Sequence, residues 1–184
     1  MKKLEILHLQ NNKISNKIKI LKNVNFKELK KLYLSGNYIS DISVLEKVKF
    51  EKLEILHLQN NKISNNIKIL KNVNFKELKE LDLSHNHILD ISVLEQIKFE
   101  KLEILNLGNN KISNINILKN VNFKELKELD LSHNHISDIS VLEKVKFEKF
   151  KKLNLGYNKI SNIKILKNVN FKELKELYLS DNDC

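Results

Sequence analysis

Residues 78–88 read LKELDLSHNHI, and the same arrangement of leucine, asparagine and isoleucine returns along the whole chain. Successive copies of the pattern L-x-x-L-x-L-x-x-N-x-I are spaced by 25, 24, 25, 24, 24, 24 and 24 residues. Such a period marks a tandem-repeat array, in which no copy can bury its apolar face alone and neighbours must stack. The first position of the pattern falls at Leu4, Leu29, Leu53, Leu78, Leu102, Leu126, Phe150 and Leu174.

Each copy contains signals for two kinds of secondary structure. The L-x-L alternation predicts a short strand whose leucines face the core. Behind it, apolar residues recur three apart at Ile39, Ile42, Leu45 and Val48, which predicts a short helix or 3₁₀ turn. The asparagine at the end of each strand is predicted to be buried and to satisfy backbone groups of the turn, so that stacked copies form an asparagine ladder.

Two further local features concern the back segments. The sequence S-x-x-E at residues 43–46, 92–95 and 140–143 predicts a helix-capping box in the even copies before the last. The odd copies lack this signal, and we expect their back segments to be more irregular. The first and third copies carry one extra residue, in ISNKIKIL and ISNNIKIL, which we place in the turn before the back segment.

This pattern resembles the leucine-rich repeat family, in particular the short repeats of some phosphatase regulatory subunits and bacterial internalins, lengthened by about two residues. The resemblance covers essentially the whole chain. It implies an α/β solenoid: a right-handed arc or horseshoe with a parallel β-sheet on the concave face and short helical or 3₁₀ segments on the convex face. We expect residues 1–184 to form one domain of eight repeats of about 24 residues. Because neither end shows a polar capping repeat, the domain is expected to be a fragment of a longer array.

Composition sets further limits on function. The chain of 184 residues is 41% hydrophobic and 30% charged, and it contains no apolar run of 18 residues that would predict a membrane span. The single cysteine, Cys184, excludes an internal disulfide and favours a reducing compartment. We therefore expect an intracellular, cytoplasmic protein, with no secretory signal visible at its start.

Motifs for chemistry are missing from the sequence. It contains no phosphate-binding loop, no dinucleotide fingerprint, no nucleophile elbow and no H-E-x-x-H pair. Eight similar copies do not build one unique catalytic constellation, so we predict no enzymatic activity, no cofactor and no small-molecule substrate. The carboxylate pairs Glu80/Asp82 and Glu128/Asp130 are predicted to be hydrated surface acids, because no apolar pocket would raise their pKa values.

The stretch LSHNHI occurs twice, at residues 83–88 and 131–136, and puts two histidines around each ladder asparagine. Both histidines of a pair are predicted to be exposed at the turn. The pairs lie two copies apart, roughly 10 Å by strand spacing, so they cannot share one zinc ion with bonds of about 2 Å. Solvated surface histidines are the favoured interpretation; a metal held by one pair with Asp82 or Asp130 is the alternative.

A partner would meet the strand residues that alternate with the inward leucines. The first such row is Ile6, Lys31, Ile55, Glu80, Ile104, Glu128, Lys152 and Glu176. The middle row is His8, Tyr33, His57, Asp82, Asn106, Asp130, Asn154 and Tyr178. The third row is small or amide: Gln10, Ser35, Gln59, Ser84, Gly108, Ser132, Gly156 and Ser180. Isoleucine interleaved with charge, together with aromatic and histidine side chains, is typical of contact surfaces, although isoleucine also simply favours strands.

The distribution of charge distinguishes between nucleic acid and protein as candidate partners. The whole chain is formally +10, which would suit nucleic acid, but the three rows hold five acids and two lysines, or 2 − 5 = −3. All basic residues are lysine, which lacks the bidentate guanidinium fork, and no aromatic platform accompanies the lysines on the back. Nucleic acid is therefore disfavoured, and no membrane partner is expected.

These observations, with the family resemblance, predict a scaffold that binds a protein partner on its concave sheet. The predicted contact residues are Ile6, His8, Tyr33, Ile55, His57, Glu80, Asp82, Ile104, Asn106, Glu128, Asp130, Asn154 and Tyr178. The alternatives are a structural spacer that self-associates end to end through uncapped ends, and a binder of anionic surfaces through the lysine-rich back.

Overall fold

A computed structural model describes residues 3–184, and in this range the chain forms one parallel sheet of eight strands arranged in sequence order. Each strand is three residues long and pairs in register with the strands of the neighbouring copies. The strands are β1 (Ile6–His8), β2 (Lys31–Tyr33), β3 (Ile55–His57), β4 (Glu80–Asp82), β5 (Ile104–Asn106), β6 (Glu128–Asp130), β7 (Lys152–Asn154) and β8 (Glu176–Tyr178). The predicted position and face of the L-x-L strands are confirmed.

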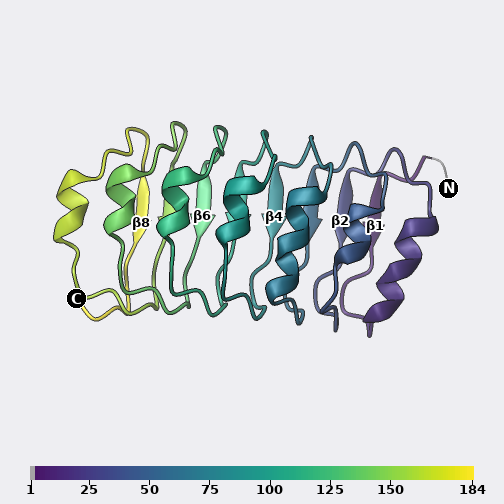
Figure 1. Ribbon diagram of the computed structural model, residues 1–184, viewed down its shortest axis with the longest axis horizontal. Coiled ribbons are helices and arrows are strands. Elements are labelled where there is room, and N and C mark those ends of the chain that lie inside the picture. Colours follow the sequence, from purple (N-terminus) through teal and green to yellow (C-terminus); the bar gives the residue numbers. More distant parts are fainter. Residues whose placement is uncertain (1–2) are drawn as a thin grey trace.

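The back segments are 3₁₀ helices, and Figure 1 shows them in one layer on the same side of the sheet. A right-handed α/β solenoid with 3₁₀ segments opposite the sheet is therefore the observed architecture. The helices are η1 (Asn16–Asn23), η2 (Ser43–Glu46), η3 (Asn65–Asn72), η4 (Ser92–Gln96), η5 (Asn116–Asn120), η6 (Ser140–Lys144) and η7 (Lys164–Asn168).

A single apolar core lies between the sheet and the helices. The middle residue of every inner strand is buried, as are back-segment residues such as Ile42 and Leu45. The core also buries a row of phenylalanines that precede the inner strands: Phe50, Phe75, Phe99, Phe123 and Phe147. Neighbouring phenylalanines stack with ring centroids 6.4 Å apart at Phe26 and Phe50 and 6.5 Å apart at Phe75 and Phe99. Each copy thus buries its apolar face only against the next copy, as a solenoid requires.

The ladder asparagines are the main buried polar groups, and Asn110 illustrates their bonding. Its amide nitrogen donates to the backbone carbonyls of Leu83, Leu107 and Gly108 at 3.0–3.2 Å, and its amide oxygen accepts the backbone N–H of Ile88 at 2.9 Å. Two of these four groups belong to the previous copy. The predicted ladder is confirmed, and each asparagine joins two copies through backbone groups that have no strand partner.

The residue before each ladder asparagine adopts a left-handed conformation, with φ between 50° and 64°. Glycine and asparagine tolerate this region best, histidine and aspartate less well, and tyrosine poorly. The residues are Asn11, Gly36, Asn60, His85, Asn109, His133, Tyr157 and Asp181. The turn therefore has a fixed backbone shape that each copy reaches with a different side chain.

The predicted capping box is wrong. Ser43 is the first residue of η2 and its side chain makes no capping bond; instead, Asp41 Oδ1 accepts the backbone N–H of Ser43 at 2.9 Å. Asp90 and Asp138 do the same in η4 and η6. The aspartate two residues before the helix competes better because its oxygen already points at the free N–H, as in an Asx turn.

The expectation of irregular back segments in the odd copies is also wrong. The helices η1 and η3 are the longest, with eight residues each, and they contain the extra residue of the first and third copies. In the fifth copy, Asn114 replaces the capping aspartate and its Oδ1 accepts the backbone N–H of Asn116 at 2.9 Å. Either side chain supplies the same acceptor, so the S-x-x-E signal does not separate regular from irregular copies.

No helix in the described part of the chain could span a membrane. The longest helices there have eight residues, and none reaches the length and apolar character needed to cross a bilayer.

Removing one ladder amide is expected to destabilise the whole array. In Asn110→Ala, buried backbone groups of two copies lose their partner, which should lower the free energy of unfolding by about 3 kcal/mol. The measurement is urea unfolding followed by circular dichroism. The exposed Asn74→Ala is the matched control and should cost less than about 0.5 kcal/mol. Equal stability of the two variants would contradict this role of the ladder.

The capping aspartates predict a pH dependence. The pKa of Asp41 lies below the ordinary value of 3.8, chiefly because its carboxylate accepts hydrogen bonds from Ser43, with Lys19 adding attraction; the pKa values of Asp90 and Asp138 are lowered for the same main reason. A lowered pKa in the folded state stabilises the fold above the unfolded pKa, and this stabilisation is lost as the pH falls through the folded pKa.

Replacement of all three aspartates by asparagine should therefore flatten the fall of stability between about pH 5 and pH 2. The asparagine oxygen keeps the acceptor, as Asn114 already does, so stability at neutral pH should be nearly unchanged. Unfolding midpoints in urea at several pH values test this. A triple variant that loses stability with acid as steeply as the parent chain would show that other carboxylates dominate.

Candidate functional site

The exposed face of the sheet collects the predicted contact residues in two adjacent rows. Strand pairing places Ile6 beside Lys31 and Ile55 in the first row, and His8 beside Tyr33 and His57 in the middle row. The same register continues to β8. The first and third residues of each inner strand are partly exposed and the middle leucine is buried. All thirteen predicted residues therefore lie on one continuous strip, here called the contact strip.

At the β1–β4 end of the contact strip, rings and a carboxylate form a connected chain. The rings of His8 and Tyr33 are stacked with centroids 4.8 Å apart, and Tyr33 meets His57 edge to face at 5.0 Å. His57 Nε2 lies 2.7 Å from Glu80 Oε1. Because each ring is held by the next, these side chains lose little freedom when a partner covers them.

In the middle of the contact strip, the aspartates and asparagines of the second row bond to the turn that follows them. Asp82 Oδ1 accepts the backbone N–H of Ser84 at 2.9 Å, and Asn106 Oδ1 accepts that of Gly108 at 3.0 Å. Asp130 and Asn154 repeat this bond. This positioning was missed in the sequence, although the spacing of Asp or Asn two residues before Ser or Gly is the known signal for an Asx turn.

A shallow depression of about 110 Å³ opens in the contact strip over β5 to β7. Ile104 contributes an apolar wall, and Asp130 Oδ2 accepts a bond from Asn154 Nδ2 at 3.0 Å. The depression combines aliphatic surface with carboxylate oxygens, which suits a long side chain with a polar end. It is lined by Ile104, Leu105, Asn106, Glu128, Leu129, Asp130, Lys152 and Asn154.

The β7–β8 end of the contact strip holds a small charged cluster. Tyr178 OH donates to Glu176 Oε2 at 2.7 Å, and Lys152 Nζ lies 3.6 Å from the same oxygen and 5.6 Å from the centre of the Tyr178 ring. The hydrogen bond to the carboxylate raises the pKa of Tyr178. The pKa of Glu176 is lowered, first by Tyr178 and then by Lys152.

Known proteins share the repeat pattern of this chain. A family model described as leucine-rich repeats (2 copies) matches residues 2–47, 76–120, 100–144 and 124–168, which is more than half of the chain. The chain belongs to the leucine-rich repeat family. Among curated protein sequences no match was found.

Solved structures of other leucine-rich repeat proteins share the fold. An internalin of Listeria monocytogenes (inlF) is 24% identical, with a TM-score of 0.58 over 97% of this chain and 61% of its own. Internalin C2 of the same species is 25% identical, with a TM-score of 0.64 over 95% of this chain and 80% of its own. A leucine-rich repeat protein of Leptospira interrogans is 26% identical, with a TM-score of 0.63 over 97% of this chain and 49% of its own.

The repeats are of the internalin type, as the sequence pattern predicted. The leucine-rich repeat fold is generally a non-enzymatic interaction scaffold, and membership of the family suggests a repeat domain for protein interaction. The chain spans 61% of the length of the first internalin and 49% of the length of the Leptospira protein.

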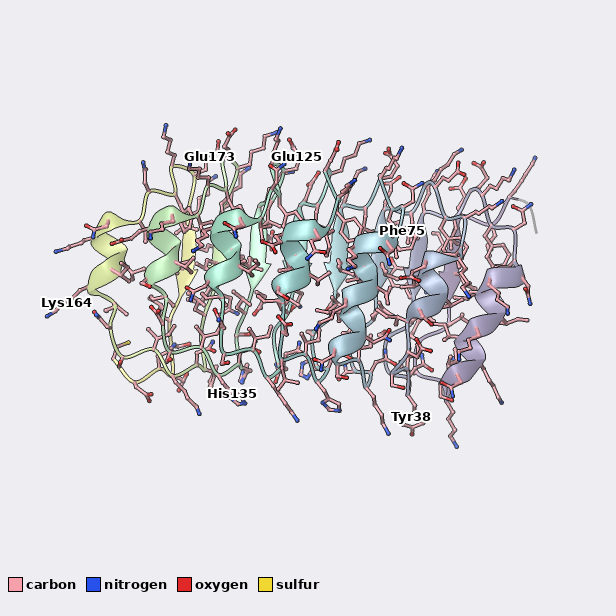
Figure 2. The ribbon with its side chains drawn as sticks, in the orientation of Figure 1. Tyr38, Phe75, Glu125, His135, Lys164 and Glu173 are labelled. Carbon is pink, nitrogen blue, oxygen red and sulfur yellow. The ribbon has the colours of Figure 1, made fainter. Side chains whose placement is uncertain are left out.

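The turn edge of this leucine-rich repeat domain carries the two histidine pairs, and Figure 2 shows His135 and Tyr38 along that edge. All four histidines are exposed. The ring of His133 stacks on Tyr157 with centroids 4.1 Å apart, and a hydrogen bond to Asp181 raises the pKa of Tyr157. No group of three or more metal-binding side chains occurs among the residues that the structure describes.

The histidines before the ladder asparagines are expected to serve the turn and not a metal. In His85→Asn/His133→Asn, asparagine suits the left-handed backbone at least as well, so the free energy of unfolding should stay within about 0.5 kcal/mol. Zinc in several-fold excess should not raise the melting temperature of the parent chain. A zinc-dependent rise that disappears in the variant would instead establish a histidine metal site.

Proposed function

We propose that this leucine-rich repeat domain binds a protein partner through the contact strip on the exposed face of its sheet. The observation that carries the proposal is a continuous series of side-chain contacts across β1 to β4. In this series His8, Tyr33, His57 and Glu80 each contact the next residue and hold one another in place. Aromatic anchors of this kind are enriched in protein interfaces.

Rigidity of the backbone supports the proposal. The strands are locked into register by parallel pairing, and every inner copy is tied to its neighbour by a ladder asparagine. A surface that is already ordered loses little conformational entropy on binding, so modest contacts suffice for affinity. Side chains of the contact strip can vary from copy to copy without affecting the core, because they alternate with the buried leucines.

The chemistry of the contact strip describes the partner. The β1–β3 end offers Ile6, which is 44% exposed, beside the stacked rings of His8 and Tyr33. The central strands add four carboxylates, Glu80, Asp82, Glu128 and Asp130, around the aliphatic side chain of Ile104. A protein surface with an apolar group opposite the rings and basic side chains opposite β4 to β6 would be complementary to both.

A triple variant tests the contact strip. Tyr33→Ala/His57→Ala/Asp82→Asn removes two rings and one charge, whereas asparagine at position 82 preserves the bond to Ser84, as Asn106 does for Gly108. We expect proteins captured from the source organism by the parent chain to be depleted at least tenfold with this variant. The measurement is quantitative mass spectrometry, followed by binding constants with the purified partner.

The control variant changes three exposed residues of η1 and η3 on the helix side: Ile20→Ala, Lys22→Ala and Lys71→Ala. It should capture the same proteins as the parent chain. Circular dichroism and melting curves must show that both triple variants are folded. Equal capture by the folded contact-strip variant, or loss with the helix-side variant alone, would reject the sheet face as the binding site.

A further inference from the structure

The side of the molecule that the helices form carries the excess positive charge of the chain. We call it the helix side and define it by seven ranges, each of which is one helix with the residues that follow it. The ranges are 16–25, 43–49, 65–74, 92–98, 116–122, 140–146 and 164–170. They hold thirteen lysines and three glutamates, so the helix side is formally 13 − 3 = +10. The whole chain is also formally +10, so all other residues together are neutral.

The lysines of the helix side are all exposed, and most of them have no acidic partner. They are Lys17, Lys19, Lys22, Lys47, Lys49, Lys68, Lys71, Lys98, Lys119, Lys144, Lys146, Lys164 and Lys167. Within the described part of the chain, only Lys19 and Lys68 of this set form ion pairs, each at 3.6 Å with an aspartate that caps a helix. The positive charge of the helix side is therefore largely uncompensated.

The three glutamates of the helix side bond to asparagines of the following copy. Glu46 Oε1 accepts a bond from Asn72 Nδ2 at 2.7 Å, and the other two glutamates are bonded in the same way. On the edge where the strands begin, by contrast, lysines pair with glutamates of neighbouring copies, as Lys52 Nζ does with Glu28 Oε2 at 2.6 Å. Charge is thus balanced between copies on that edge and left unbalanced on the helix side.

The opposite face of the molecule has the opposite charge. The three rows of strand residues hold two lysines and five acids and are formally 2 − 5 = −3. A negatively charged surface attracts the helix side and repels the sheet face. Such a surface would therefore bind the molecule in one orientation, with the contact strip pointing away from it.

Three lysines of the helix side surround a hollow between η1 and η2. The hollow has a volume of about 160 Å³ and is lined by Lys19, Lys22, Ser43, Val44 and Lys47. No acidic side chain is among these lining residues. Three ammonium groups around one opening suit a phosphate group, whose oxygens accept charge-assisted hydrogen bonds from several donors at once.

The side chains between the lysines indicate which anionic surface fits. Helices η1 to η7 contain no arginine and no aromatic residue, so they lack the guanidinium forks and stacking platforms that hold single-stranded nucleic acid. Partly exposed isoleucines lie beside the lysines instead, at Ile69 in η3 and Ile117 in η5. Lysines with apolar neighbours are typical of surfaces that lie on anionic lipid, where the ammonium groups attract headgroups and the aliphatic side chains enter the headgroup layer.

The arrangement of the helices suits a broad partner surface. Figure 1 shows them side by side in one layer along the whole array. At a strand spacing of about 4.8 Å, the eight copies extend over roughly 34 Å. Lysines of several helices can therefore reach one flat surface at the same time, whereas a linear polyanion would contact only those along its path.

We propose that the helix side binds the surface of an anionic lipid bilayer, with headgroup phosphates among its lysines and the contact strip facing away from the membrane. This proposal replaces the expectation of no membrane partner, because the structure collects the lysines on one face, as the alternative of an anionic-surface binder requires. The contact strip stays exposed in this orientation, so the inference is independent of the proposed function.

The experiment is co-sedimentation of residues 1–184 with phosphatidylcholine vesicles that contain or lack phosphatidylserine. The chain should bind the vesicles that contain phosphatidylserine and leave the neutral ones unbound. Raising the salt from about 0.1 M to about 0.5 M should weaken this binding about tenfold or more, because the screening length falls well below about 10 Å.

A lysine variant tests the helix side directly. Lys22→Gln/Lys47→Gln/Lys71→Gln removes three exposed lysines of this side, two of which line the hollow. Binding to the anionic vesicles should weaken about thirtyfold or more, since each lysine near such a surface contributes roughly fivefold. The contact-strip triple variant should bind these vesicles like the parent chain.

The matched control removes the same charge elsewhere. Lys13→Gln/Lys111→Gln/Lys159→Gln changes three exposed lysines of the turn edge and should weaken vesicle binding less than about threefold, because those lysines lie beyond the screening length from the membrane. Melting curves must show that both variants are folded.

A fluorescent reporter gives the orientation. The chain has no tryptophan, so a single introduced one is an unambiguous probe. Gln96→Trp places it at an exposed position of η4, and Tyr38→Trp places it on the turn edge. Anionic vesicles should shift the emission of Gln96→Trp to shorter wavelength and leave that of Tyr38→Trp unchanged.

Three results would overturn the proposal. The first is equal binding to anionic and neutral vesicles, or binding to neither. The second is an equal loss of vesicle binding in the two lysine variants, because the net charge of the chain and not the helix side would then cause the attraction. The third is lysine-dependent binding to a random-sequence DNA duplex without binding to vesicles, because the helix side would then serve nucleic acid.

Discussion

The asparagine ladder is the interaction on which the rest of this structure depends. A strand of three residues followed by a left-handed turn leaves carbonyl and N–H groups that no sheet partner reaches, and burying them unpaired would be costly. One amide per copy supplies up to three donated bonds and one accepted bond and joins two copies at once. The short strand, the tight turn and the close stacking of copies are therefore possible together only with this side chain.

The fixed turn also decides what the surface can present. Because the ladder sets the backbone path, the strand residues that alternate with the leucines occupy the same two rows in each copy, whatever their identity. The aspartates and asparagines of the middle row then bond to the turn itself, as Asp82 does to Ser84, while the rings of Tyr33 and His57 contact their neighbours in the row. Because successive strand residues point to opposite faces of the sheet, the buried leucines contribute to stability while the residues between them determine the chemistry of the surface.

Much of this could be predicted from the sequence, because the repeat multiplies each weak signal eightfold. The strands, the buried leucines, the ladder and the first two exposed rows follow from the period alone. The prediction that the third row is also exposed is wrong at Ser84, Gly108, Ser132 and Gly156, which are buried. The helix caps did not, since Ser43 and Glu46 satisfy a known motif while the aspartate at 41 lies closer to the free N–H. The left-handed turn was missed as well, although seven of the eight residues that occupy it are Gly, Asn, Asp or His, the types that favour a positive φ, and only Tyr157 departs from this preference. Which side chains of the contact strip touch one another depends on rotamers, which a pattern does not encode.

Most copies read alternately K-L-E and E-L-K around the first leucine of the pattern. Ion pairs between these residues join neighbouring copies, as between Lys52 and Glu28 and between Lys79 and Glu54. On the contact strip, the K-L-E copies up to β5 place Ile6, Ile55 and Ile104 in the first row, and the copies between them place Lys31 and Glu80. Apolar and charged positions therefore repeat at about 10 Å, twice the strand spacing. A partner of the proposed kind that fits one such pair of copies fits the next only if its own groups have the same spacing.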